Sequence, residues 1–319
     1  MLPKKMLPTP DTSHVPTNLV YDPAEDSYLL LDTLSSDSER AFLRHNFPAS
    51  ASLGSPSPLV AEEKEVITAV PSFPSDVVAP AENEIGGADR LISTATPLVL
   101  ELGTGSGIVS AFLSAHAGHI LGRRDVLVAA TDLNPHACKA AGETIQKAIV
   151  SSSSQSSQCA APSSASSSSP DVHGVATFLD IYQADLASPL RPGQVDILIF
   201  NPPYVPTEAL PSAPLTPRPS SPSSPEEEEK YYLSLAFAGG HDGMEVTSRL
   251  VASLPRILSP RGCAYILLCR QNDPEGVKRT ICGLGAEWRA GTVGSSGKTA
   301  GWEKLVVVRA WREGAAEGL

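Results

Sequence analysis

Short apolar segments alternate with helix-like segments along this chain, and this alternation constrains the fold more than any other feature. Alternation of this kind produces a mainly parallel sheet, and right-handed crossovers place helices on both of its faces. We therefore expect an α/β fold with a doubly wound, mostly parallel, seven-stranded sheet whose tail forms an antiparallel pair. The expected strands are 97–103, 125–132, 175–186, 195–201, 262–270, 287–294 and 302–311.

Helices are expected from Ser106 to about His116, over 134–150 and over about 244–258. Asn134 can cap the second of these, because an amide oxygen accepts the free N–H groups of a first turn and Pro135 suits the first helical position. Ahead of the sheet, "VYDPAEDSYLLLDTL" predicts another helix. There Asp22 is a candidate N-cap, with Pro23 at the first position and an apolar leucine stripe behind it.

Three stretches have a composition that does not suit a core. Residues 151–170 contain 12 serines in 20 positions, and too little apolar surface to offset the entropy of ordering them. We expect a single domain over 15–311, interrupted by disordered insertions at 35–95, 151–172 and 207–230.

Composition narrows the class of protein. The net charge is −11 and the pI is about 5.1, so the chain lacks the broad basic surface that drives nucleic-acid binding. Its five cysteines are scattered without a CxxC pair, which is typical of reduced thiols in a cytoplasmic or nuclear protein without a zinc site of its own. The start of the chain does not resemble a signal peptide, because no apolar stretch follows its lysines.

The first candidate site is "LELGTGSG", in which Gly103, Gly105 and Gly107 lie between a strand and a helix. Such a turn lets a ligand approach the backbone closely. The spacing differs from the G-x-G-x-x-G pattern of dinucleotide-binding proteins, which argues against NAD. Asp132 ends the next strand, where a carboxylate can accept both hydroxyls of a ribose. A tight turn and a helix-capping aspartate are the structural alternatives.

Asp185 and Leu186 follow the third expected strand in "QADL". An aspartate at this edge can accept an adenine amino hydrogen while the leucine packs on the ring. A simple turn aspartate explains the same spacing equally well.

The most specific motif is "NPPY", Asn201 to Tyr204, at the end of a buried strand. Pro203 forces Pro202 into an extended conformation, so the Pro202 carbonyl should lack a ladder partner. The Asn201 side-chain carbonyl lies beside it, and Tyr204 offers a flat face. Two acceptors and a ring suit a planar –NH₂ group, at the sheet edge where open α/β folds bind ligands.

These motifs together resemble the class I S-adenosylmethionine-dependent methyltransferases, whose fold is Rossmann-like. Within them the chain is most similar to the HemK-like glutamine methyltransferases, in the short eukaryotic and archaeal form that modifies class 1 translation release factors. "YDPAEDSYLLLDTL" is the more specific mark of this subfamily, whereas the "NPPY" motif is shared with adenine and guanine amino-methyltransferases. The resemblance covers 15–34, 97–150, 173–206 and 231–311.

The resemblance implies a role for each motif residue. Glu101 and Gly103, with Gly105 in the same turn, would line the methionine end of S-adenosylmethionine, and Ser27 would contact it from the first helix. Asp132 would hold the ribose, and Asp185 with Leu186 the adenine. Asn201 would face both the methyl donor and the substrate amide, with Pro202, Pro203 and Tyr204 completing the catalytic motif.

The resemblance also implies partners, a release factor as substrate and a small zinc-binding activator subunit. The expected reaction is N5-methylation of the glutamine in a Gly-Gly-Gln loop. The alternatives are methylation of an amino group in DNA or RNA, methylation of a protein lysine, and a cofactor-binding scaffold without catalysis. The acidic charge disfavours nucleic acid, an ammonium has less use for two acceptors, and the intact "NPPY" motif disfavours the scaffold.

Overall fold

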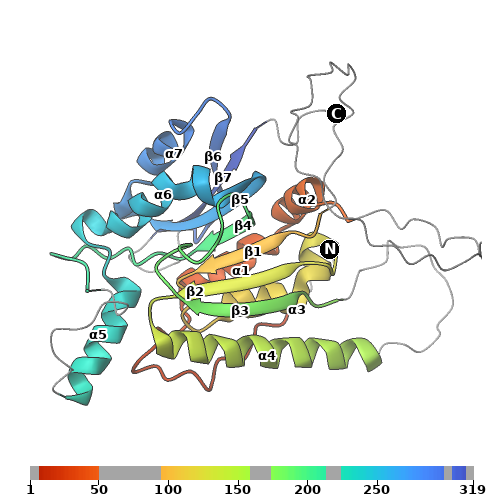
Figure 1. Ribbon diagram of the computed structural model, residues 1–319, viewed down its shortest axis with the longest axis horizontal. Helices are drawn as coiled ribbons and strands as arrows, with labels where there is room; N and C mark the ends of the chain where they lie inside the picture. The colour runs from red at the N-terminus through yellow and green to blue at the C-terminus, as the bar shows by residue number, and fades with distance from the viewer. Residues whose placement is uncertain (1–6, 50–94, 159–173, 213–223, 298–303, 314–319) are drawn as a thin grey trace, which may run out of the picture.

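The computed structural model describes residues 7–49, 95–158, 174–212, 224–297 and 304–313. Its strands form one sheet in the order β3-β2-β1-β4-β5-β7-β6 (Figure 1). Neighbouring strands from β3 to β5 are parallel, and β7 is antiparallel to both β5 and β6. The expected fold class is therefore confirmed. The strands are β1 (Leu98–Leu102), β2 (Leu127–Asp132), β3 (Thr177–Gln183), β4 (Val195–Phe200), β5 (Leu258–Cys269), β6 (Trp288–Ser295) and β7 (Leu305–Arg312).

Helices cover both faces of the sheet, as the right-handed crossovers require. Within the described residues, none of them is both long and apolar enough to cross a membrane. The helices are α1 (Glu25–Leu34), α2 (Asp37–Asn46), α3 (Ile108–Leu121), α4 (Pro135–Gln158), α5 (Pro225–Phe237), α6 (Glu245–Ile257) and α7 (Pro274–Cys282).

The core divides into two layers because successive strand residues point to opposite faces. In β4, Ile197 and Ile199 pack in the layer beneath α1, α2 and α3. Leu198 and Phe200 pack in the layer beneath α6 and α7. All six residues of β4 are buried, as a central parallel strand with helices on both faces should be.

The predicted extent of the three irregular stretches is wrong, because helices occupy part of each. α2 lies inside 35–95, α4 continues to Gln158, and α5 begins inside 207–230. α2 forms because Ser36 caps its first turn and Leu43 is completely buried, so ten residues suffice despite the composition around them. Residues 50–94, 159–172 and 213–223 of these stretches lie outside the described residues, and the 15–311 domain extent stays a prediction.

The two capping predictions have different outcomes. The Asn134 side chain accepts from the His136 N–H at 2.9 Å, at the start of α4, as predicted. The Asp22 cap is wrong, because α1 begins at Glu25 and its N-cap is Ala24, which makes no side-chain cap. The preceding chain is used differently: Val20 is buried against α4, and Tyr21 lines a cavity at the sheet edge.

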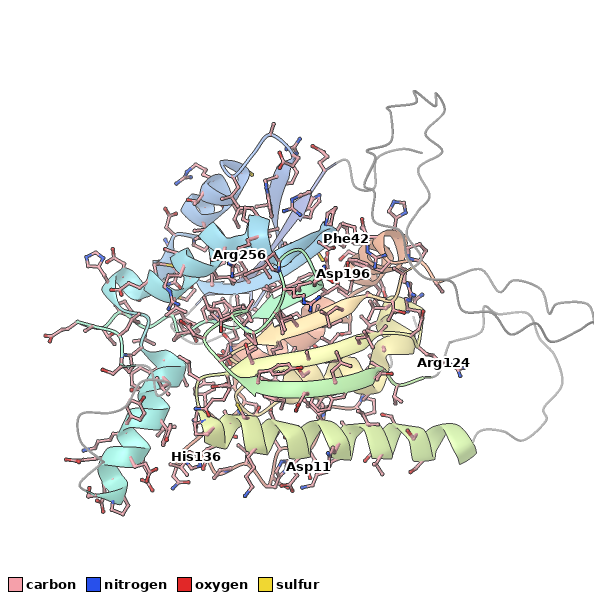
Figure 2. All side chains as sticks on the ribbon, in the orientation of Figure 1. Asp11, Phe42, Arg124, His136, Asp196 and Arg256 are labelled. Atoms are coloured by element: carbon pink, nitrogen blue, oxygen red, sulfur yellow. The ribbon has the colours of Figure 1, made fainter. Side chains whose placement is uncertain are left out.

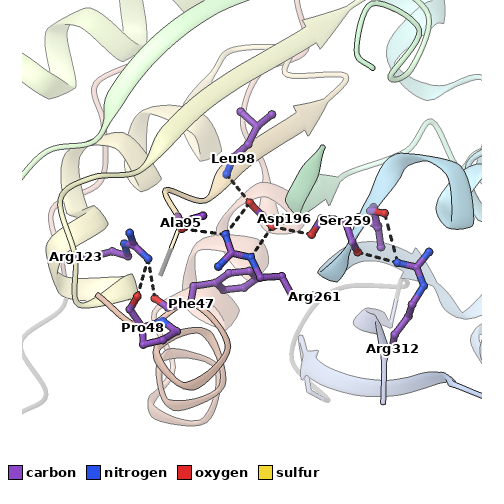
Figure 3. Close-up of polar contacts among 10 residues, drawn as sticks. Phe47, Pro48, Ala95, Leu98, Arg123, Asp196, Ser259, Arg261 and Arg312 are labelled. Atoms are coloured by element: carbon purple, nitrogen blue, oxygen red, sulfur yellow. Dashed lines mark hydrogen bonds and ion pairs between the residues drawn. The ribbon is translucent and has the colours of Figure 1, made fainter. Parts of the chain in front are cut away.

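A polar network connects the amino ends of the central strands (Figure 3). The motif residues lie at the carboxyl ends of these strands. The buried Asp196 carboxylate accepts from the Leu98 backbone at 3.0 Å and from the Ser259 hydroxyl at 2.7 Å. Arg261 donates to the same carboxylate from 2.9 Å and lies over the Phe47 ring. This network joins β1, β4 and β5, and accounts for a buried acid that belongs to the framework.

Candidate functional site

The sheet reverses its strand order at β1. From there the chain goes outward through β2 to β3 and then returns to place β4 on the other side of β1. Open α/β folds bind ligands at the carboxyl ends of the strands at such a switch point. The glycine turn follows β1 and the "NPPY" motif follows β4, so the topology brings both to this edge.

Two adjoining cavities lie at this edge and share Gly103, Asp132, Pro203 and Leu235. The first holds most of the sequence-predicted residues, namely Ser27, Glu101, Gly103, Gly105, Asp132, Asn201 and Pro203. The second holds Asp185 and Leu186 with Arg249 of α6. One continuous site therefore runs from α1 across β1 and β2 to the end of β3.

The three glycines of the turn have different tasks. All three have positive φ, with Gly103 at 59°, Gly105 at 53° and Gly107 at 78°. A Cβ on Gly107 would lie 2.6 Å from the Cα and Cβ of Ala141, so this glycine lets α3 approach α4. Gly105 has open space where its side chain would be, and it lines the first cavity. The turn therefore exposes backbone to a ligand at Gly103 and Gly105, and it allows close packing of α3 on α4 at Gly107.

Asp132 is fixed by backbone donors from both sides. Its Oδ2 accepts from the Gly105 N–H at 2.8 Å, and its Oδ1 accepts from the Asn134 N–H at 2.8 Å. Burial raises the pKa of the Asp132 carboxyl, and the backbone N–H groups of Asn134 and Gly105 oppose that rise. The carboxylate is held in one orientation at the point where the two cavities meet.

Glu101 lies one residue before the end of β1 and is 4% exposed. Its Oε2 accepts from the Thr104 hydroxyl at 2.7 Å and from the backbone and hydroxyl of Ser110. Burial raises the pKa of Glu101 to about 7, since the three hydrogen bonds to the charged form offset only part of the desolvation. A buried acid with such a pKa, lining a cavity, is typical of a functional site.

Asn201 carries the most informative polar contacts in the first cavity. Its Nδ2 donates to Oδ2 of Asp26 in α1 at 3.0 Å. Its Oδ1 is buried and accepts no hydrogen bond within the described part of the chain. Buried polar atoms are nearly always paired, so an unpaired acceptor in a residue that lines a cavity indicates a ligand donor.

The other motif residues are placed differently from one another. Pro203 lines both cavities, and Pro202 is buried. Tyr204 packs against the core layer beneath α1 to α3, and its carbonyl accepts from Asn272 at 3.2 Å. Tyr204 lines neither of these two cavities, and its role as a flat face for a substrate stays a prediction.

At the outer end of the site, Asp185 is paired with Arg249, whose guanidinium Nη2 donates to Oδ2 of the carboxylate. Leu186 has a positive φ of 50°, unusual for a residue with a side chain, and packs against the core layer beneath α6. Asp185 can accept an adenine amino hydrogen only if it shares its oxygens with Arg249. Sequence reasoning missed this arginine, which follows Asp185 by 64 positions.

The helix α5 covers the first cavity, although the insertion predicted at 207–230 includes its first six residues. Tyr232, Leu235 and Ala236 line that cavity. The Tyr232 ring lies 4.7 Å from that of His136, which is in the first turn of α4 and faces α5 (Figure 2). Figure 1 shows α5 beyond the carboxyl ends of the strands. The Ser224 cap and Pro225 at the first turn are the sequence signals that could have found it.

Comparison with known proteins gives relatives along most of the chain, although no protein-family model matches it. Methyltransferase HEMK2 of Mus musculus is 33% identical over 239 residues, which are 73% of this chain and 89% of that protein. The eRF1 methyltransferase catalytic subunit mtq2 of Schizosaccharomyces pombe is 29% identical over 275 residues, which are 84% of this chain and 81% of that protein.

Among solved structures, the complex of Mtq2 with Trm112 from E. cuniculi, which methylates the translation termination factor eRF1, has a TM-score of 0.39 at 19% identity. That similarity covers 68% of this chain and 86% of the other. The identity of 33% with the mouse protein extends over 73% of this chain. The sheet order and the cavity at the carboxyl ends of the strands are consistent with this relationship. The chain belongs to the HEMK2 family of methyltransferases.

Proposed function

We propose that this enzyme transfers a methyl group from S-adenosylmethionine to the side-chain nitrogen of a glutamine in a class 1 translation release factor. The observation that carries the proposal is the buried, unpaired Oδ1 of Asn201, a residue that lines the cavity. An acceptor in that position holds an N–H donor, and a glutamine amide provides one. The name of the S. pombe relative supports the choice of substrate.

The residues of the cavity fit S-adenosylmethionine. Asp132 presents two fixed carboxylate oxygens, which match the vicinal hydroxyls of a ribose. Gly103 and Gly105 leave backbone accessible beside it, and Glu101 provides an acid for the amino group of the methionine end. When bound, the cofactor supplies an electrophilic methyl group on a sulfonium.

The substrate amide needs help because its nitrogen lone pair is delocalised into the carbonyl. Asn201 Oδ1 and the Pro202 carbonyl would each accept one of the two amide hydrogens. Held in this way, the nitrogen is oriented toward the methyl donor, and its growing positive charge is stabilised by two acceptors. One of the two N–H protons leaves the nitrogen as the new N–C bond forms, and because methylation makes that proton acidic, the mechanism requires neither a metal nor a strong base.

A nucleic-acid amino group is the second candidate, since the same motif would hold it. The net charge of −11 argues against a long phosphate backbone on this surface. The first turn of α5, the helix whose later residues line the cavity, adds Glu226, Glu227 and Glu228. A lysine is less suitable, because its ammonium must lose a proton before it can attack. The neutral amide is therefore the preferred substrate.

We also propose a small zinc-binding partner subunit that docks along β3. This strand is one of the two edges of the sheet, and Leu179 and Tyr182 are exposed on it at 47% and 38%. An exposed apolar edge strand offers unpaired backbone groups that a second chain can cover. The S. pombe relative is named as a catalytic subunit, which supports a second subunit.

We place the complex in the cytoplasm, with the nucleus as a second compartment, since the described cysteines are free thiols.

The test is a methyl-transfer assay with labelled S-adenosylmethionine, with and without the partner subunit. The acceptors are a release factor with its Gly-Gly-Gln loop, the same factor with that glutamine changed to alanine, DNA and structured RNA. We expect label on the first acceptor alone. Label on nucleic acid, or equal label on both release factors, would contradict the glutamine assignment and favour the second candidate.

A further inference from the structure

The Asn201 side chain has two chemically different ends, and only one of them is useful to the reaction. Its Nδ2 contacts Asp26, while its Oδ1 has no partner within the described residues. The two ends of an amide have nearly the same shape, so packing alone does not decide which one faces the cavity. If the amide were reversed, a donor would face the substrate's own N–H groups and the site would lose its acceptor.

Asp26 removes this ambiguity by its chemistry. An ionised carboxylate accepts hydrogen bonds and donates none, so only the Nδ2 end of Asn201 can pair with it. In the reversed orientation Oδ1 would meet a carboxylate oxygen, and two acceptors would face each other in a buried site. The bond to a charged acceptor is also stronger than one between neutral groups.

Asp26 is itself held in place. It is 4% exposed, in the first turn of α1, and its Oδ1 accepts from the Ser27 backbone at 2.6 Å and from the Ser27 hydroxyl at 3.3 Å. Negative charge is favoured at the amino end of a helix. Leu30 and Leu34 of the same helix are completely buried, which fixes α1 on the sheet.

We propose that Asp26 is a positioning residue that sets the orientation of the Asn201 amide, so that Oδ1 faces the substrate. Asp26 acts on Asn201 through its Oδ2, while its Oδ1 faces Ser27, a cavity residue on the same helix turn. This role rests on the proposed function, because it assigns the substrate's N–H groups to the acceptor that Asp26 presents. It also explains why an acid from α1 reaches a residue 175 positions away in sequence.

The test uses an exchange of the two side chains. In D26N the new amide can pair with either end of the Asn201 amide, so the orientation of Asn201 is no longer fixed. In N201D two carboxylates lie side by side. We expect each variant to lower kcat at least tenfold. In D26N/N201D the amide at position 26 donates to the carboxylate at position 201, whose second oxygen remains an acceptor for the substrate. We expect the double variant to recover at least tenfold in kcat over N201D, with cofactor affinity within about twofold of wild type.

The matched control is D32N, in the same helix, because Asp32 is exposed. It should keep wild-type kcat. If Asp26 has a purely structural role, D26N should lower thermal stability, and the double variant D26N/N201D should show no recovery of kcat over N201D. That outcome, or a D26N enzyme with wild-type kcat, would overturn the proposal.

A second measurement does not depend on the substrate. The Asn201 side-chain NH₂ resonance, assigned by its loss in N201A, should exchange slowly with solvent in wild type and D32N and at least tenfold faster in D26N. If the wild-type enzyme fails to label a release factor but this pattern holds, the proposed function is wrong and the positioning stands. Equal exchange in all three proteins would refute the positioning itself.

Discussion

Two acids, Glu101 and Asp132, line the same cavity, and the pKa of each is raised from its ordinary value. Burial is the largest cause of the raised pKa in both, and the charge of Asp132 adds to the rise at Glu101. Only Asp132 has a backbone N–H on each of its two oxygens. At the residue scale, Asp132 is therefore suited to neutral hydroxyls, and Glu101 to a cationic group that would favour its ionised form.

The raised pKa of Glu101 gives a pH dependence of stability. In the unfolded chain the carboxyl titrates near its ordinary value of about 4.3, and in the fold near about 7. Between these values the folded protein binds more protons, so its stability falls as pH rises through this window, by about 4 kcal/mol in total. Thermal unfolding of wild type and E101Q from pH 4 to 8 checks this. A slope that is identical in both proteins would contradict it.

Asp132→Ala should weaken cofactor binding, because two hydrogen bonds from ribose hydroxyls to a charged acceptor are lost. A loss of about 1.5–3 kcal/mol for each bond to a charged group is expected. Calorimetric titration with S-adenosylmethionine measures the change, and circular dichroism checks that the variant is folded. Unchanged affinity in a folded variant would remove Asp132 from the site.

Asn201→Ala should lower kcat by about 100-fold while cofactor affinity stays within a few-fold of wild type. The acceptor that it removes acts on the amide as charge develops on nitrogen, and this is a contribution to the transition state. Steady-state kinetics with the release factor, beside calorimetry with the cofactor, separates the two effects. A loss confined to cofactor affinity would show that Asn201 only binds the methyl donor.

At the scale of the elements, the strands that form the site were predictable and their coverings were not. β1, β2 and β4 are buried, and each ends in a motif residue or just before one, so apolar runs and turn residues identify them. α5 has no buried residue, and the buried residues of α2 are Glu39 and Leu43, so few buried apolar positions mark either helix in the sequence. The partners of Asn201 and Asp185, namely Asp26 and Arg249, come from α1 and α6 and meet them only in three dimensions.

Gly107→Ala tests the close approach of α3 to α4. The new Cβ would lie 2.6 Å from two atoms of Ala141, and the residue has a positive φ of 78°. Overpacking and the left-handed backbone together should lower the free energy of unfolding by about 2–5 kcal/mol. Gly193→Ala is the control, since its φ of 70° is similar but nothing lies within 4 Å of its Cβ. Chemical denaturation should show a much smaller loss in the free energy of unfolding for Gly193→Ala. Equal losses in the two variants would show that the contact between α3 and α4 is not the cause.

At the scale of the whole molecule, the two edges of the sheet differ. At one edge β6 lies beyond β7, and Trp288 of β6 is buried beneath the α6 and α7 layer. At the other, β3 has five of its seven residues exposed, while its inward residues Phe178 and Ile181 pack toward α4. An open edge of this kind favours association with another chain, and this is the surface assigned above to the partner subunit.

Leu179→Asp should disrupt that association, because a carboxylate would be buried in the interface without a partner. We expect at least a tenfold weaker complex, equivalent to about 1.4 kcal/mol or more, with unchanged cofactor affinity in the isolated chain. Val150→Asp is the control, since Val150 is an exposed apolar residue on α4 and not on the strand. Co-purification and titration with the partner subunit measure both variants. Binding should also raise the unfolding temperature of the wild-type chain, because the partner stabilises only the folded form. If Leu179→Asp binds the partner as wild type does, the docking surface lies elsewhere than on β3.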